Sequence, residues 1–138
     1  MSLTLRVLAP DQSVYDGSAE EVILPSTTGL IGILPGHISL VTALEIGVLR
    51  VMKDGKWNSI ALMGGFAEVE ANDVTVLVNG AELGEKIDSL SAEAEFEKAQ
   101  TELNQLDNAK ENSTKKLKTQ EALNKARARL QASKKEGQ

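Results

Sequence analysis

The feature that most constrains the fold of this chain is an abrupt change of composition near residue 84. From Ser91 to Lys135 the sequence contains no proline, glycine or valine, and residues that favour helices dominate: alanine, glutamate, lysine, glutamine and leucine. Before that point, short runs of β-forming residues are separated by glycine, proline and aspartate at intervals of about eight to twelve residues. We therefore predict a sandwich or barrel of about eight to ten short strands, followed by helices.

The strands are expected at residues 3–8, 13–17, 20–25, 39–43, 47–52, 57–62, 66–70 and 74–78. Asp54-Gly55 lies between two of these runs, and this pair is typical of a tight hairpin turn. Gly64-Gly65 separates two others and predicts a break or bend.

The helical part is predicted to form a weakly buried hairpin of two helices. Apolar residues recur at helical spacing in each helix, and a polar break at residues 107–113 separates the two stripes. The first stripe is Ala92, Phe96, Ala99, Leu103 and Leu106, and the second is Ala122, Leu123, Ala126 and Leu130. Because alanine buries much less apolar surface than leucine, the hairpin should be marginal alone. It is either a mobile element or an ordinary hairpin that stays docked.

Charge is distributed unevenly along the chain. Residues 1–88 hold 5 basic and 12 acidic groups, whereas residues 115–138 hold 8 basic and 2 acidic groups. A basic C-terminal end on an acidic protein suggests that this end meets an acidic partner, and the alternative is a solvated helix face.

The composition argues against most enzyme classes. The chain has no cysteine and one histidine, and it contains neither a Gly-x-Ser-x-Gly elbow nor a Walker-type phosphate loop. Its aromatic content of 3% is low for a surface that stacks nucleic-acid bases. The N-terminus lacks the pattern of a signal peptide, and no apolar run approaches the roughly 20 residues of a membrane span. We expect a soluble, intracellular chain that is not an enzyme.

Residues 26–37 form a loop-rich segment with two interpretations. Gly29 and Gly32 permit unusual backbone angles, and Pro35-Gly36 marks a turn beside His37. Leu30 and Ile31 are large apolar residues near the expected tip. The segment is either a plain hairpin with a tight exit turn or a tip that a partner covers.

Three motifs resemble one known family, the epsilon subunits of F-type ATP synthases. They are Gly29-x-x-Gly32-x-x-Pro35-Gly36-His37, Gly64-Gly65-Phe66-Ala67-Glu68-Val69 and Asn72-Asp73-Val74-Thr75-Val76-Leu77. The resemblance covers the whole chain and implies an α+β protein. Its parts would be a ten-stranded β-sandwich in residues 1–86 and an antiparallel two-helix hairpin in residues 87–138.

The resemblance also implies a non-catalytic subunit of the central stalk, without a cofactor. The subunit would bind the gamma subunit and the c-ring, peripherally at the cytoplasmic or stromal face of an energy-transducing membrane. The family's c-ring contact loop falls on Thr27, Thr28, Gly29, Leu30 and Ile31. Pro35, Gly36 and His37 would form the turn that orients this loop.

In the family the C-terminal hairpin is regulatory. It folds onto the sandwich, or extends so that its cations meet an acidic segment of the beta subunits and block ATP hydrolysis. The matching cations here are Lys115, Lys116, Lys118, Lys125, Arg127 and Arg129.

Some bacterial members bind ATP, and the corresponding positions here are Ile87, Asp88, Lys125 and Arg129. The arginine of the family's Ile-Asp-x-x-Arg-Ala motif is replaced by Ser91, which removes a bidentate phosphate contact. We therefore expect ATP binding to be weak or absent. The alternative to the stalk subunit is a β-sandwich adaptor whose basic hairpin binds nucleic acid.

Overall fold

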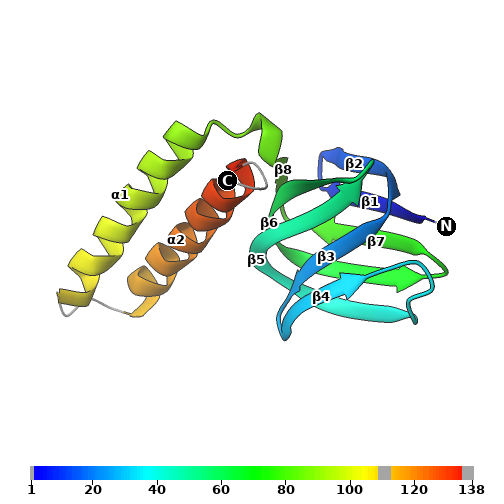
Figure 1. Cartoon of the computed structure of the whole chain (residues 1–138). Coiled ribbons are helices and arrows are strands. Elements are labelled where there is room, and N and C mark those ends of the chain that lie inside the picture. Colours follow the sequence, from blue (N-terminus) through cyan, green and yellow to red (C-terminus); the bar gives the residue numbers. More distant parts are fainter. Residues whose placement is uncertain (1, 109–112, 135–138) are drawn as a thin grey trace.

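The computed structural model describes residues 2–108 and 113–134, which form a β-rich body and a helical hairpin (Figure 1). The body contains β1 (Leu3–Ala9), β2 (Gln12–Ala19), β3 (Glu21–Ser26), β4 (Gly29–Ile33), β5 (Leu40–Lys53), β6 (Lys56–Glu70), β7 (Asp73–Val78) and β8 (Ala81–Leu83). A 3-10 turn, η1 (Gly84–Lys86), leads to α1 (Ser89–Asn108) and α2 (Ser113–Ser133).

Two long strands run through both layers of the sandwich. The strand order is β2-β1-β7-β6-β5-β3-β4, and β8 pairs with β6. The start of β5 pairs with the end of β6 in the layer of β1, β2 and β7. The end of β5 and the start of β6 join β3, β4 and β8 in the other layer. The described body thus has eight strands, and the expectation of ten is corrected because β5 and β6 each contribute a segment to both layers.

Glycines let β6 turn from one layer to the other without ending. Gly64 has φ +83° and Gly65 has φ +153°, which L-residues rarely adopt. A Cβ on Gly65 would lie 2.1 Å from the carbonyl oxygen of Leu77, so the close approach of β7 also requires glycine. The predicted turn at Asp54-Gly55 is confirmed, since both residues have positive φ.

The sandwich core is built from alternate strand residues. On β1, Leu3, Leu5 and Val7 are fully buried while Thr4 and Arg6 are exposed. Large side chains from β3, β5, β6 and β7 complete the same cluster, including Leu24, Leu49, Leu62 and Val76. The core therefore lies within the β-rich body and includes none of the described helix residues.

The hairpin is docked, with α2 between α1 and the sandwich (Figure 1). Ala92 and Ala132 pack with Ala61 of the sandwich and with Ile87, and a second cluster, Ala99 with Leu123 and Ala126, joins the two helices to each other. The expected second stripe needs one correction, because Ala122 is exposed while Ala128 is buried. A helix between two surfaces buries more than one stripe. No helix in the described part of the chain is long and apolar enough to cross a membrane.

Candidate functional site

The tip of the β3–β4 hairpin is shaped by a buried serine. The Ser26 hydroxyl accepts a hydrogen bond from the Thr28 amide over 3.2 Å and donates one to the Gly29 carbonyl. Gly29 has φ +124°, which allows the chain to turn there. The result is a well-defined tip on which the Leu30 side chain is 75% exposed.

The five residues expected to contact a ring divide into two groups. Thr27, Thr28, Gly29 and Leu30 are exposed, whereas Ile31 pairs with Leu24 and packs partly against the sandwich core. The tip thus presents one large apolar side chain outward, rather than the two that the sequence suggested.

The turn at Pro35, Gly36 and His37 lies at the other end of β4 from this tip. The His37 amide donates to the Leu34 carbonyl over 3.1 Å, and the Gly36 amide donates to Oδ1 of Asn72 over 2.8 Å. The first bond closes the turn, and the second ties it to the loop between β6 and β7. The His37 ring hydrogen-bonds to the neighbouring Ile38 carbonyl oxygen through Nδ1.

An outer apolar face, made of Val41, Phe66 and Leu77, lies on neighbouring strands of one layer. Phe66 pairs with Leu77 across β6 and β7, and Val41 lies on the same face of β5. Their side chains are 70%, 61% and 55% exposed. Sequence reasoning missed this face, although strand alternation places these residues opposite the buried positions.

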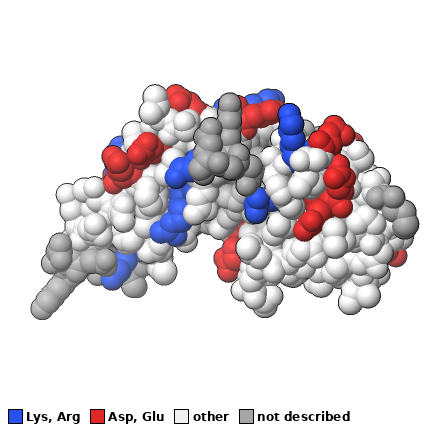
Figure 2. All heavy atoms as spheres, viewed as in Figure 1, with Lys and Arg blue, Asp and Glu red and all other residues white. Residues whose placement is uncertain are grey.

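The six cations expected to act together lie in two groups along α2. Lys115, Lys116 and Lys118 are exposed near its N-terminal end, whereas Lys125, Arg127 and Arg129 follow about two and a half turns later. Lys125 pairs with Glu121 over 3.4 Å, and the Arg127 guanidinium lies 5.9 Å from the centre of the Phe96 ring. Figure 2 shows this basic stretch along the middle of the hairpin, with acidic groups on both sides.

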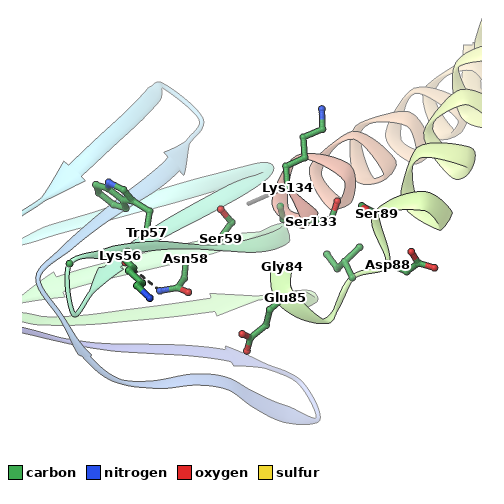
Figure 3. A pocket seen from close by; sticks show the side chains of 13 residues that line it. Lys56, Trp57, Asn58, Ser59, Gly84, Glu85, Asp88, Ser89, Ser133 and Lys134 are labelled. Carbon is green, nitrogen blue, oxygen red and sulfur yellow. Dashed lines mark hydrogen bonds between the residues drawn. The ribbon is translucent and has the colours of Figure 1, made fainter. Parts of the chain in front are cut away.

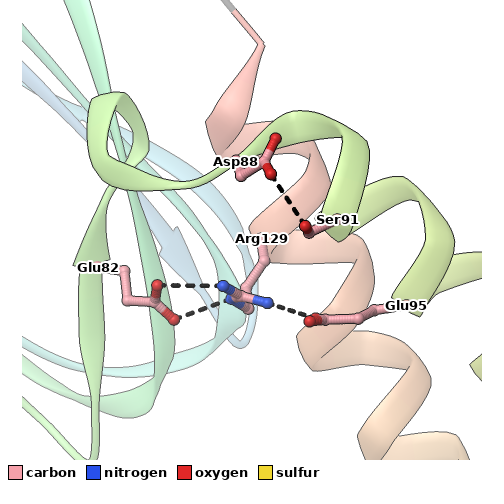
Figure 4. A network of polar contacts seen from close by, with 5 residues as sticks. All are labelled: Glu82, Asp88, Ser91, Glu95 and Arg129. Atoms are coloured by element: carbon pink, nitrogen blue, oxygen red, sulfur yellow. Dashed lines mark hydrogen bonds and ion pairs between the residues drawn. The ribbon is translucent and has the colours of Figure 1, made fainter.

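Arg129 on α2 joins β8 and α1, both of which are distant from it in sequence (Figure 4). Its Nε donates to Glu82 Oε1 over 2.9 Å, one terminal nitrogen donates to Glu82 Oε2 over 3.3 Å, and the other contacts Glu95. The bond to Glu82 is the main cause that raises the pKa of Arg129, burial acts in the opposite direction, and Glu95 adds to the rise. Sequence patterns did not single out Glu82 or Glu95, because their partner is far away along the chain.

The expected nucleotide positions serve structural roles in the docked hairpin. Ile87 is buried, and Asp88 caps α1 by accepting hydrogen bonds from the Leu90 amide and the Ser91 hydroxyl. Ser91, which stands where the family motif has arginine, is therefore turned toward Asp88 (Figure 4).

An open groove of about 930 Å³ lies where the hairpin meets the sandwich (Figure 3). Its walls carry Lys56 and Trp57 from β6, Asp88 just before α1, and Lys134 just after α2. These charges have both signs. Among the described residues, no group of three or more histidine, cysteine, aspartate and glutamate side chains could hold a metal ion.

Comparison with protein families gives a match to each part of the chain. Residues 2–84 match the ATP synthase Delta/Epsilon chain β-sandwich domain, and residues 85–134 match the long α-helix domain of the same chain.

Relatives match over almost the whole length. The ATP synthase epsilon chain of Prochlorococcus marinus strain MIT 9303 is 73% identical over 97% of this chain and 100% of its own length. That of Parasynechococcus marenigrum strain WH8102 is 68% identical, over 97% of this chain and 98% of its own.

Solved structures share the fold at low identity. A chain of the Euglena gracilis mitochondrial ATP synthase covers 92% of this chain and 78% of itself, with a TM-score of 0.77 at 22% identity. One from the Tetrahymena thermophila central stalk and c-ring structure covers 97% and 98%, with a TM-score of 0.62 at 11% identity.

Proposed function

This chain belongs to the family of ATP synthase epsilon chains, and we propose that its C-terminal hairpin leaves the docked position to inhibit ATP hydrolysis. As an epsilon chain it is a non-catalytic subunit of the central stalk of an F-type ATP synthase, the enzyme that couples proton transport to ATP synthesis. Its own contribution would be to restrain the reverse reaction, in which ATP is hydrolysed.

The observation that carries the proposal is the composition of the surface on which α2 docks. Three of the four buried residues in that contact are alanines, Ala61, Ala92 and Ala132, and each buries far less apolar area than a leucine. Ordering a helix opposes docking through conformational entropy, so a surface of this kind leaves only a small net stabilisation. A hairpin held this weakly can exchange between two positions when a partner offers comparable contacts.

The charge of α2 indicates the chemistry of that partner. Lys115, Lys116 and Lys118 lie near the N-terminal end of the helix, where the helix dipole disfavours cations. An acidic segment of the beta subunits would offset this repulsion and engage Lys125, Arg127 and Arg129 as well. Binding to nucleic acid is less favoured, since the aromatic content of 3% is low for a surface that stacks bases.

The sandwich supplies two further surfaces for stalk partners. The outer apolar face of Val41, Phe66 and Leu77 is suited to the gamma subunit, because burying it removes apolar surface from water. The exposed Leu30 and its neighbours Thr27, Thr28 and Gly29 are suited to the c-ring. The subunit would then sit peripherally at an energy-transducing membrane, on its cytoplasmic or stromal side.

Truncation after Lys86 tests this assignment in the assembled enzyme. None of the described helix residues belongs to the sandwich core, so we expect residues 1–86 to fold alone, bind gamma and support assembly. ATP hydrolysis should be faster with the truncated chain than with the full chain. Equal hydrolysis with both chains would overturn the inhibitory role, and failure of residues 1–86 to fold would overturn the division into two domains.

A further inference from the structure

We propose that Arg129, Glu82 and Glu95 form a latch that sets how often the hairpin leaves the sandwich. The inference deepens the proposed inhibitory function and rests on it. The latch joins the sandwich through Glu82 on β8, the outer helix through Glu95 on α1, and the middle helix through Arg129 on α2. Undocking α2 from the sandwich separates Arg129 from Glu82.

The geometry makes this a stronger contact than an ordinary surface ion pair. The guanidinium hydrogen-bonds to both carboxylate oxygens of Glu82, and such a bidentate pair combines charge attraction with fixed geometry. The Arg129 side chain is only 26% exposed, so solvent screens it less than a fully exposed lysine. Both carboxylates sit on one cation, which makes a network rather than a single pair.

The latch should supply a large part of the free energy that holds the hairpin on the sandwich, because the contacts around it are small. Next to it, the contact between hairpin and sandwich consists of Ala61, Ala92 and Ala132 with Ile87, flanked by partly buried Val48, Met63 and Leu130. Small side chains contribute little apolar burial, and a charge network beside them therefore matters more than it would beside a leucine-rich interface.

The latch also competes directly with inhibition. A guanidinium that grips Glu82 and Glu95 cannot at the same time grip an acidic segment of another subunit. Neutralising the two glutamates therefore frees the hairpin while keeping every cation of α2. Neutralising Arg129 frees the hairpin too, but removes one of the cations that the inhibited state would use. Both changes should therefore favour undocking, but the arginine change should inhibit hydrolysis less than the glutamate changes.

The docking equilibrium can be measured on the isolated full chain. The sequence has no cysteine, so spin labels at Asp11→Cys on the sandwich and Leu117→Cys on α2 report the separation of the two parts. Both positions are exposed. We compare the parent with Glu82→Gln/Glu95→Gln. The control is Glu93→Gln, which removes an exposed charge from α1, the helix that carries Glu95. The melting temperature of each variant verifies that the sandwich is folded.

We expect the double variant to raise the population at long distances by roughly three- to ten-fold, and Glu93→Gln to leave it unchanged. Added salt should shift the parent in the same direction as the double variant. Equal distance distributions in all three chains, with the sandwich folded, would overturn the latch.

Hydrolysis by the assembled enzyme separates the latch from the function on which it rests. We expect Glu82→Gln/Glu95→Gln to inhibit more strongly than the parent, and Arg129→Gln to inhibit less than the double variant. A larger long-distance population without stronger inhibition would support the latch and contradict the inhibitory role of the hairpin.

Discussion

A Cβ placed on Gly84 would lie 2.0 Å from the carbonyl oxygen of Ala132. Backbone atoms of η1 and of the last turn of α2 therefore approach each other more closely than any side chain would permit. Gly84 has no positive φ, so the requirement for glycine at this position is steric. The approach fixes where the end of α2 rests on the sandwich.

Gly84→Ala should accordingly displace the end of α2 while leaving the sandwich folded. Overpacking of a close contact costs about 1–3 kcal/mol, which is enough to weaken a marginal hairpin. Hydrogen exchange should be faster in residues 122–133 and unchanged in β1 and β7. Gly80→Ala is the control, since a Cβ there meets Met63 Cγ at an ordinary 3.4 Å. Equal exchange in both variants would show that the contact does not hold the helix.

Leu30→Ala should weaken coupling to the c-ring without destabilising the chain. The side chain is 75% exposed, so its removal leaves no cavity in the core. We expect slower ATP-driven proton pumping in membranes and an unchanged melting temperature. Leu24→Ala, on the facing strand but fully buried, should lower the free energy of unfolding by about 2–5 kcal/mol. Unchanged pumping in the Leu30 variant would show that this side chain does not contribute to the contact with the c-ring.

Phe66→Thr should weaken binding to gamma. Threonine suits a strand, and Phe66 is 61% exposed, so the fold should tolerate the change. The loss of apolar surface from the outer apolar face should lower affinity, measured by titrating gamma with residues 1–86. Leu30→Ala serves as the matched control, because it removes an exposed apolar side chain elsewhere. If both variants bind gamma as the parent does, another surface makes the contact.

Isothermal titration should detect weak or no binding of ATP to the isolated chain. Ser91 cannot supply the two hydrogen bonds of an arginine, and Arg129 is already paired with Glu82 and Glu95. Arg129→Ala should therefore change the heat signal little. Micromolar affinity in the parent chain, lost in that variant, would contradict this expectation.

Tyr15 should ionise above its ordinary pKa of 10.0 in the folded chain. Burial raises the pKa first, and the charge of Asp54 adds to the rise. The chain has one tyrosine, so ultraviolet titration follows it alone. Asp54→Asn should lower the midpoint, and the unfolded chain should titrate near about 10. Because the folded chain favours the protonated ring, Tyr15 adds to the free energy of unfolding below about pH 10. This contribution is lost as the pH rises through the pKa of Tyr15 in the folded chain. An identical midpoint in the parent and in the Asp54→Asn variant would rule out the charge effect.

Local patterns predicted most of the elements of this fold. The alternation in β1, the Asp54-Gly55 turn and the helical spacing from Ala92 to Leu103 depend on neighbours along the chain, and each is found in the structure. Four expected strands merge into β5 and β6. In β6 the merging could not be predicted, because the Gly64-Gly65 pair marks a bend as readily as a break.

The candidate surfaces were less accessible from sequence. Leu30 stood out because a large apolar residue in a turn is unusual. The pairing of Glu82 and Glu95 with Arg129 could not be predicted, because carboxylates are common in such a chain and Arg129 lies 47 and 34 positions away. The outer apolar face required knowledge of which side of each strand the core occupies.

The passage of β5 and β6 through both layers has a mechanical consequence. A force applied at one layer reaches the other along covalent backbone and the continuous ladder between these strands, rather than through side-chain packing alone. The two layers therefore resist sliding past each other. A sandwich braced in this way would turn as one stiff piece in a rotating stalk, and the proposed movement of the hairpin would not need to deform it.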